Sequence, residues 1–206
     1  IIPIPPPDDD GIVFLTANTN PHNTNRTMQR KVTIQGVAGC YHDAAAREYF
    51  GADEIMPVEC DSFPEMFERL EADASLIGIM AIENTIAGAL LQNHELLRKS
   101  SLTIVGEHRM RISHVLAALP GQSIDELTEV NSHPMALMQC EQFLRRHRNL
   151  RMVEKFDTAG SAREIAAGSL KGHAAVCGEF AAQHYGLEIL ETVSYTHLTL
   201  PTTERV

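Results

Sequence analysis

The residues best suited to chemistry lie in four short segments, each of which follows an apolar run typical of a strand. Each segment combines glycine, hydroxyl or amide groups with the start of a predicted helix. The segments are Gly36 to Cys40, Ala81 to Gly88, Asn131 to Pro134 together with Gln139, and Asp157 to Ala162. Helix N-termini offer unpaired N–H groups to anions, and ligands of α/β sheets bind at the carboxyl ends of strands. The pattern therefore predicts a cleft for a small anionic molecule.

Each segment also has a structural interpretation, which the residues alone leave open. The glycines of Gly36 to Cys40 could simply form a tight turn. This run is not GxGxxG and no ribose-binding acid is evident, which argues against a dinucleotide site. Asn84 and Thr85 could bond a carboxylate or cap the next helix. His133 could orient an anion or transfer a proton, or it could be a surface residue beside a Ser132 cap.

Composition excludes several classes of protein. The 206 residues carry 17 basic and 27 acidic side chains, a net charge of −10, whereas nucleic-acid-binding domains are basic. No apolar run approaches the roughly 20 residues that span a bilayer, which argues against a membrane protein. The four cysteines form no CxxC pair and the ten histidines form no HExxH motif. We therefore predict reduced cysteines, no metal site and a cytoplasmic protein.

Both ends of the chain differ from its middle. Residues 1–30 are rich in proline, aspartate and asparagine, and only Ile12 to Leu15 is briefly apolar, so we predict an unfolded leader without signal-peptide features. Met28 directly precedes a strong strand, and we expect it to be the natural start. Residues 193–206 show neither the periodicity of a helix nor that of a strand. We expect a non-native tail there, although a frayed native terminus would look the same.

Between these ends, strand and helix patterns alternate. Strands are predicted over residues 31–35, 55–58, 77–82, 102–105, 112–119, around 130, 151–156, 173–177 and 187–190. Helices are predicted over residues 41–50, 62–70, 88–99, 134–144, 157–168 and 179–185. The alternation indicates an α/β fold with mostly parallel strands. A length of roughly 160 residues suits two small α/β lobes.

Together and in this order, the four segments resemble prephenate dehydratase. Gly36 to Tyr41 resembles the family's G-x-x-G-(Ser/Thr)-aromatic turn, and Ile82 to Gly88 its Ile-Glu-Asn-(Ser/Thr)-x-x-Gly stretch. The family's Ser-His-Pro…Gln-Cys stretch corresponds to Ser132, His133, Pro134, Gln139 and Cys140. Its hydroxyl-rich turn corresponds to Thr158 to Ser161. The resemblance spans residues 31–192. It implies two lobes like those of a periplasmic binding protein, with the active site between them.

The resemblance implies conversion of prephenate to phenylpyruvate in phenylalanine biosynthesis, with loss of water and carbon dioxide and without a metal or organic cofactor. Helix N-termini and amides can hold the two carboxylates of prephenate. Because aromatisation drives the reaction, the protein mainly orients the substrate and assists departure of hydroxide. The implied substrate-binding residues are Gly36, Gly39, Cys40, Asn84, Thr85, Gly88, Ser132, His133, Gln139, Thr158 and Ser161. Of these, His133 is also the candidate catalytic residue.

The resemblance also sets the expected domains and partners. Lobe one is expected over residues 31–105 with 187–192, and lobe two over residues 106–186. The expected partner is the small-molecule substrate, with a homodimer in the full-length form. Neither nucleic acid nor a membrane is expected as a partner.

The chain departs from the family's pattern in ways that bear on activity. The family has Pro at the position of Val37, Ser or Thr at the position of Cys40, and Ser at the position of His42. Ala159 replaces a hydroxyl residue of the family's fourth segment. A thiol is a weaker hydrogen-bond donor than a hydroxyl. The family's Asn-x-Thr-Arg-Phe motif, whose Thr is taken as the proton donor, does not occur, and neither does the phenylalanine-binding ACT domain. We therefore expect a truncated, weakly active dehydratase. A non-catalytic carboxylate-binding module or an arogenate dehydratase is the alternative.

Overall fold

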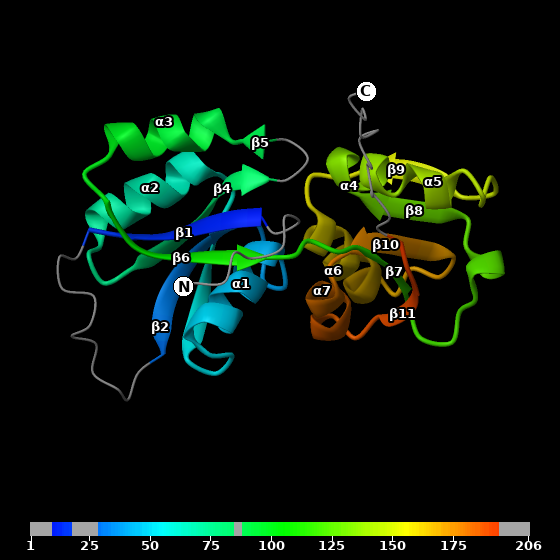
Figure 1. Ribbon diagram of the computed structural model, residues 1–206. Helices are drawn as coiled ribbons and strands as arrows, with labels where there is room; N and C mark the ends of the chain where they lie inside the picture. The colour runs from blue at the N-terminus through cyan, green and yellow to red at the C-terminus, as the bar shows by residue number, and fades with distance from the viewer. Residues whose placement is uncertain (1–9, 18–28, 85–87, 194–206) are drawn as a thin grey trace, which may run out of the picture. The chain divides into compact units, whose positions relative to one another are not determined.

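The computed structural model describes residues 10–17, 29–84 and 88–193, which form two compact units divided between Ile112 and Ser113 (Figure 1). The α/β class and the division into two parts are confirmed. Three expectations fall outside the described residues: the start at Met28, the role of Thr85 and the tail after Val193. Among the described helices, none has the length and apolar character needed to cross a membrane.

Unit 1 is built on a mixed sheet with the strand order β3-β2-β4-β1-β6, and a short strand β5 pairs with β4. Its elements are β1 (Asp10–Thr16), β2 (Arg30–Gln35), α1 (Tyr41–Phe50), β3 (Ile55–Cys60), α2 (Phe63–Ala72), β4 (Ile77–Asn84), β5 (Gly88–Ala89), α3 (Leu91–Lys99) and β6 (Thr103–Met110). β2 runs parallel to β3 and β4, whereas β1 runs antiparallel to β4 and β6. The carboxyl ends of β2, β3 and β4 therefore meet at one edge.

Helices cover both faces of this sheet because its strands bury side chains on both sides (Figure 1). On the face covered by α2 and α3, Val13 and Leu15 of β1 belong to one core cluster with Leu70 of α2. On the other face, Phe14 stacks on Tyr49 of α1 with ring centroids 4.2 Å apart. The alternation along β1 therefore ties both helical layers to the sheet.

The expectation that residues 1–30 do not fold is wrong for β1. Ile12, Val13, Phe14 and Leu15 are at most 3% exposed, and β1 lies between β4 and β6. A four-residue apolar run is too short to reveal a periodicity in the sequence. Burial between two strands nevertheless stabilises it, by about 1.5–3 kcal/mol for each large side chain.

Unit 2 contains a second mixed sheet, with the strand order β11-β7-β10-β8-β9. Its elements are β7 (Val115–Ala118), the 3-10 helix η1 (Ile124–Glu126), β8 (Glu129–Ser132), α4 (Pro134–Gln139), α5 (Glu141–Leu144), β9 (Arg151–Glu154), α6 (Thr158–Gly168), β10 (His173–Cys177), α7 (Glu179–His184) and β11 (Glu188–Thr192). β8 runs parallel to β9 and β10, whereas β7 runs antiparallel to β10 and β11.

The two faces of the unit 2 sheet are packed differently. Leu137 of α4 and Phe143 of α5 belong to a core cluster with Val130 of β8. α6 and α7 lie on the other face (Figure 1), and they contribute small buried residues such as Ala162 and Ala181. Small residues let these helices approach the strands closely. On this face, therefore, helix backbone as well as side chains packs against the sheet.

The structure corrects three further expectations. β6 pairs with β1 as far as Met110, and β11 pairs with β7, so residues 106–112 belong to unit 1 and residues 187–192 to unit 2. Strand pairing is mixed rather than mostly parallel, because β1, β7 and β11 enter their sheets antiparallel. Val193, expected in the tail, is 1% exposed in the core of unit 2.

Candidate functional site

The carboxyl ends of three neighbouring parallel strands meet at one edge of the unit 2 sheet. β8 leads into α4, β9 leads into α6, and β10 leads into α7. β7 runs in the opposite direction, and its first residue, Val115, pairs with Cys177 at the end of β10. His114, which precedes β7, therefore lies at the same edge as His133 and Thr158. This edge unites the candidate residues of unit 2.

His133 itself caps α4, in place of the Ser132 cap that the sequence suggested. Its ring Nδ1 accepts a hydrogen bond from the Met135 N–H at 3.2 Å. An accepting Nδ1 carries no proton, so the neutral ring holds its proton on Nε2. Proline at the first helical position fits this start because it has no N–H to satisfy. His133 is half-buried and offers one N–H donor at the edge of the sheet.

Ser132 and Ser161 have structural roles instead of exposed hydroxyls. Ser132 is fully buried, and its hydroxyl donates to the Val176 carbonyl at 2.5 Å, which joins β8 to β10. Ser161 is 1% exposed, and its hydroxyl donates to the Asp157 carbonyl at 2.8 Å. Neither side chain reaches the surface where a ligand would bind. Of the predicted hydroxyl residues in unit 2, Thr158 is the one with an accessible side chain.

The N-terminus of α6 already holds a carboxylate from its own chain. Asp157 accepts hydrogen bonds from the N–H groups of Ala159 and Gly160, at 3.1 and 3.2 Å. Asp157 is therefore the N-cap of α6. A carboxylate in this place satisfies the donors and repels a second anion, so these N–H groups are not the anion site that the sequence suggested.

Gln139 is held by a residue that sequence reasoning missed. Its side-chain oxygen Oε1 lies 2.7 Å from Nε2 of His114. His114 is 3% exposed, and burial lowers the pKa of its imidazole, while the bond to Gln139 opposes that shift. A neutral ring is therefore present near neutral pH. The available signal was the polar pair Ser113 and His114 directly before the apolar run of β7.

The glycine turn of unit 1 satisfies its own N–H groups. Gly36 and Gly39 have φ angles of 106° and 87°, which favour glycine. The Ala38 N–H donates to the Glu59 carboxylate at 2.7 Å, and the Gly39 N–H donates to the Asp43 carboxylate at 2.8 Å. The turn is therefore closed by two carboxylates, which makes the structural interpretation the better description of its backbone.

Cys40, which follows this turn, caps α1 without a side-chain bond to the helix. Its thiol lies 3.7 Å from the carbonyl of Gln35, and the residue is 6% exposed. All four cysteines of the chain lie among the described residues, where each is buried and none forms a disulfide. Burial raises the pKa of the Cys140 and Cys177 thiols to about 12, so neither is a thiolate at neutral pH.

The end of β4 forms a hairpin rather than the start of a helix. The backbone of Asn84 pairs with Gly88, whose φ is 73°, and α3 begins three residues later with Leu90 as its cap. Asn84 therefore does not cap α3, and the predicted helix over 88–99 begins later. Because β2 and β4 are parallel neighbours, Asn84 and the glycine turn lie at the same edge of unit 1.

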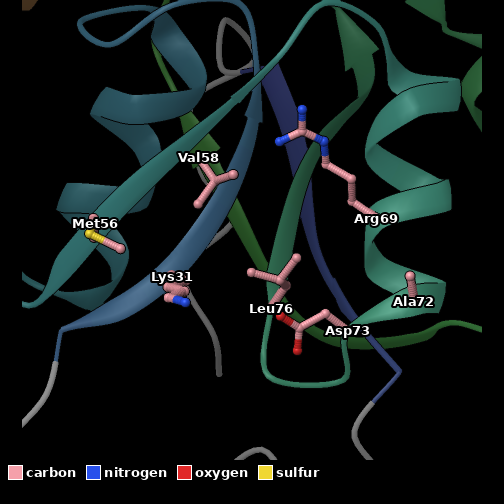
Figure 2. Close-up of a pocket in the computed structure, with 7 residues that line it drawn as sticks. All are labelled: Lys31, Met56, Val58, Arg69, Ala72, Asp73 and Leu76. Atoms are coloured by element: carbon pink, nitrogen blue, oxygen red, sulfur yellow. The ribbon is translucent and has the colours of Figure 1, made fainter.

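A shallow groove of about 390 Å³ lies elsewhere on unit 1, between α2 and the strands β2 and β3 (Figure 2). Met56, Val58 and Leu76 give it an apolar floor, and Lys31 and Arg69 bring cations to its rim. Lys31 and Met56 stand near the starts of their strands, whereas the candidate residues follow the strand ends. The groove therefore does not belong to the predicted site.

Comparisons with known proteins agree with this architecture. The family model for prephenate dehydratase matches residues 32–196. The chain is 40% identical over 161 residues to Arogenate dehydratase 1 of Petunia hybrida, a match that covers 78% of this chain and 38% of that protein. It is 39% identical over 162 residues to Arogenate dehydratase/prephenate dehydratase 6, chloroplastic, of Arabidopsis thaliana, covering 78% and 39%.

A solved structure gives the same result. The prephenate dehydratase of Arthrobacter aurescens in complex with L-Phe matches with a TM-score of 0.70 and 25% identity, over 80% of this chain and 55% of that one. The chain spans about two fifths of the length of the two curated relatives. The family match includes every predicted site residue, while β1 precedes it. By this match over most of its length, the chain belongs to the prephenate dehydratase family.

Proposed function

We propose that the full-length protein removes water and carbon dioxide from prephenate to give phenylpyruvate. One observation carries the proposal: the family match over residues 32–196 contains His133 and Gln139, two side chains with N–H groups to donate at one sheet edge. Both are uncharged donors in a part of the molecule where the N-termini of α4 and α6 already bond to the chain's own side chains. An anionic substrate can therefore be bound there by side chains.

The proposed reaction needs a donor but little other chemistry from the protein. The bond from the ring to its carboxylate breaks, and its electron pair forms the new ring double bond. The C–O bond at the opposite ring carbon breaks as that electron pair moves, and the departing hydroxide takes one proton. Atoms balance as prephenate giving phenylpyruvate, carbon dioxide and water. The protein's contribution is to orient the substrate and to donate hydrogen bonds to the carboxylate or to the leaving oxygen.

In this scheme His133 donates from Nε2 and Gln139 donates from its amide nitrogen. A hydrogen bond to a charged group contributes about 1.5–3 kcal/mol, which makes these two side chains the main candidates for binding energy in unit 2. Thr158, on the first turn of α6, is a further candidate, with Asp157 beside it occupying the helix N–H groups. In unit 1, Gly36, Gly39 and Cys40 shape the turn, and Asn84 and Gly88 stand at the same edge.

Arogenate is the second candidate substrate, because both curated relatives described above carry arogenate dehydratase in their names. Arogenate has an ammonium group where prephenate has a keto group. The same elimination would then give phenylalanine directly. An acidic or carbonyl acceptor near the side chain of the substrate would favour arogenate. Glu83, an exposed carboxylate near the end of β4, is a candidate for that acceptor.

The test is to supply each substrate to this chain and to a version extended through the family's Thr-Arg-Phe motif. We expect phenylpyruvate from prephenate with the extended protein, and weak turnover by the 206-residue chain. Phenylalanine from arogenate at a higher kcat/KM would establish the second candidate instead. A reaction without protein at the same pH corrects for spontaneous aromatisation. No product from either substrate with the extended protein would contradict the proposal and leave a carboxylate-binding module.

A further inference from the structure

The contact between His114 and Gln139 joins two elements that are far apart in the sequence. His114 directly precedes β7, and Gln139 is the last residue of α4. Nε2 of His114 lies 2.7 Å from Oε1 of Gln139. His114 is nearly inaccessible to solvent, whereas Gln139 is half-buried, so the histidine stands behind the amide as seen from solvent.

The backbone on both sides of this contact is fixed. The carbonyl of His114 accepts a hydrogen bond from the Val193 N–H at 2.9 Å, and the next residue, Val115, pairs with the end of β10. Cys140, next to Gln139, is 1% exposed in the unit 2 core, and its N–H bonds the Ala136 carbonyl at 3.0 Å. The imidazole and the amide therefore meet between two well-anchored segments.

The arrangement determines what Gln139 offers to a ligand. A buried neutral imidazole with its proton on Nε2 donates to Oε1, which leaves the amide nitrogen as the outward donor. Among the described residues, none accepts a hydrogen bond from that nitrogen. With the other tautomer and a flipped amide, Gln139 would instead present its oxygen, which repels a carboxylate.

We propose that His114 is a positioning residue, whose Nε2–H holds the oxygen of Gln139 so that the amide N–H groups face an anionic ligand. The identity of that ligand rests on the proposed function; the orientation of the amide does not. A side chain already held in its binding orientation loses less freedom when the ligand arrives. His114 thus acts through Gln139 and does not touch the substrate.

The orientation can be read without any activity. A long-range ¹H–¹⁵N spectrum of the labelled 206-residue chain reports which ring nitrogen of each histidine is protonated. The His114→Gln variant assigns the His114 signal by its disappearance. We expect the Nε2–H form near pH 7. The Nδ1–H form would overturn the proposal.

The effect on binding is measured by titrating prephenate into wild type and variants. His114→Leu and Gln139→Met should each weaken binding about tenfold, the loss of one hydrogen bond to a charged group. Because one residue acts through the other, the double variant should bind no more weakly than Gln139→Met alone. His114→Gln keeps an N–H near the position of Nε2 and should restore most of the affinity.

His173→Gln is the matched control, because His173 lies at the opposite end of the parallel strands, paired with Glu129. It should bind prephenate as wild type does. Independent, multiplying losses in the double variant, or wild-type affinity in His114→Leu, would overturn the proposal. If wild type binds no prephenate, the proposed function fails for this chain, and the ring tautomer alone decides the positioning role.

Discussion

Units 1 and 2 both place turns at the carboxyl ends of parallel strands, but different groups satisfy the N–H donors of those turns. In unit 1 the donors of Ala38 and Gly39 face the carboxylates of Glu59 and Asp43. In unit 2 the donors of α6 also face a carboxylate, that of Asp157, but the first donor of α4 faces the uncharged ring of His133. A carboxylate closes such a turn against anions, whereas a neutral imidazole does not. On this comparison we expect the anion-binding side chains at the α4 end of unit 2 and a more structural turn in unit 1.

The two units also differ in how much of each the family match includes. All described residues of unit 2 lie within the family match, which covers residues 32–196. The central strand β1 of unit 1, in contrast, precedes the match. Unit 1 therefore depends on residues outside the family pattern for part of its core. This difference makes the stability of unit 1 the more sensitive to substitutions near the N-terminus.

The largest expected effect tests that dependence. Phe14→Ala removes a fully buried ring that stacks on Tyr49 and contacts Phe50 edge-on. Loss of a buried phenylalanine costs about 3–5 kcal/mol, so the urea midpoint of unit 1 should fall sharply. Glu107→Gln, which changes an exposed side chain on the neighbouring strand β6, is the control and should leave the midpoint nearly unchanged. A wild-type midpoint for Phe14→Ala would show that β1 does not support the sheet in solution.

The closed turn of unit 1 gives the next effect. Asp43 is fully buried, and it accepts bonds from the Gly39 N–H and from the Arg47 side chain, at 2.8 and 2.9 Å. Asp43→Ala leaves both donors without this partner and should destabilise the protein by about 3 kcal/mol.

Glu59→Gln is the matched variant, because it keeps an oxygen for the Ala38 N–H on an exposed side chain. Its cost should stay below about 0.5 kcal/mol. Urea unfolding of both variants measures the difference. Equal and small costs would mean that the carboxylates do not hold the turn, and the contrast between the units would weaken.

A smaller effect is expected at the N-terminus of α6. Asp157→Ala removes a cap that accepts two N–H bonds and should cost about 1 kcal/mol. Asp157→Asn keeps the capping oxygen and removes the negative charge from the edge of unit 2. It should leave the unfolding midpoint almost unchanged and strengthen prephenate binding slightly. Weaker binding by Asp157→Asn would indicate that the charge itself serves the site.

The smallest effect is a pH dependence that sharpens the role of His114. Burial lowers the pKa of His114 below its ordinary value near 6.5. The unfolded chain therefore takes up a proton at a higher pH than the folded chain does. The stability that comes from neutral His114 is complete above about pH 6.5 and is lost as the pH falls through the folded pKa.

His114→Gln has no such group, so its unfolding free energy should fall less steeply than that of wild type between pH 7 and pH 5. Urea titrations of both proteins at several pH values measure the difference in slope. Parallel slopes would mean that the folded protein does not resist protonation of His114.

Much of the architecture follows from local sequence signals. The predicted helix over 41–50 and strand over 173–177 have the observed bounds. The helix predicted over 62–70 is α2, and its cap Ser62 accepts a hydrogen bond from the Glu65 N–H at 3.3 Å. In these places the propensity of the residues and the tertiary environment favour the same structure, so local reasoning is sufficient.

Features that depend on distant partners could not be predicted in the same way. β1 is stabilised by β4 and β6, which begin more than 60 residues away. No pattern within β1 itself indicates that it pairs with these strands. The composition of β7 and β11 likewise does not indicate that these strands run antiparallel to their neighbours. The roles of Glu59 and His114 depend on partners more than 20 residues away. The sequence motifs predict the segments of the candidate site, whereas the tertiary contacts determine which of their atoms remain available to a ligand.

The central claim is that side chains at the edge of unit 2 hold the substrate's carboxylate. The most direct measurement is a prephenate titration of the ¹⁵N-labelled protein, which follows the ring nitrogens of His133, the side-chain amide of Gln139 and the backbone amides of Ala38 and Gly39. We predict saturable shifts at His133 and Gln139, with smaller shifts at the turn of unit 1. Saturable shifts at Ala38 and Gly39 while His133 and Gln139 stay unchanged would contradict the account.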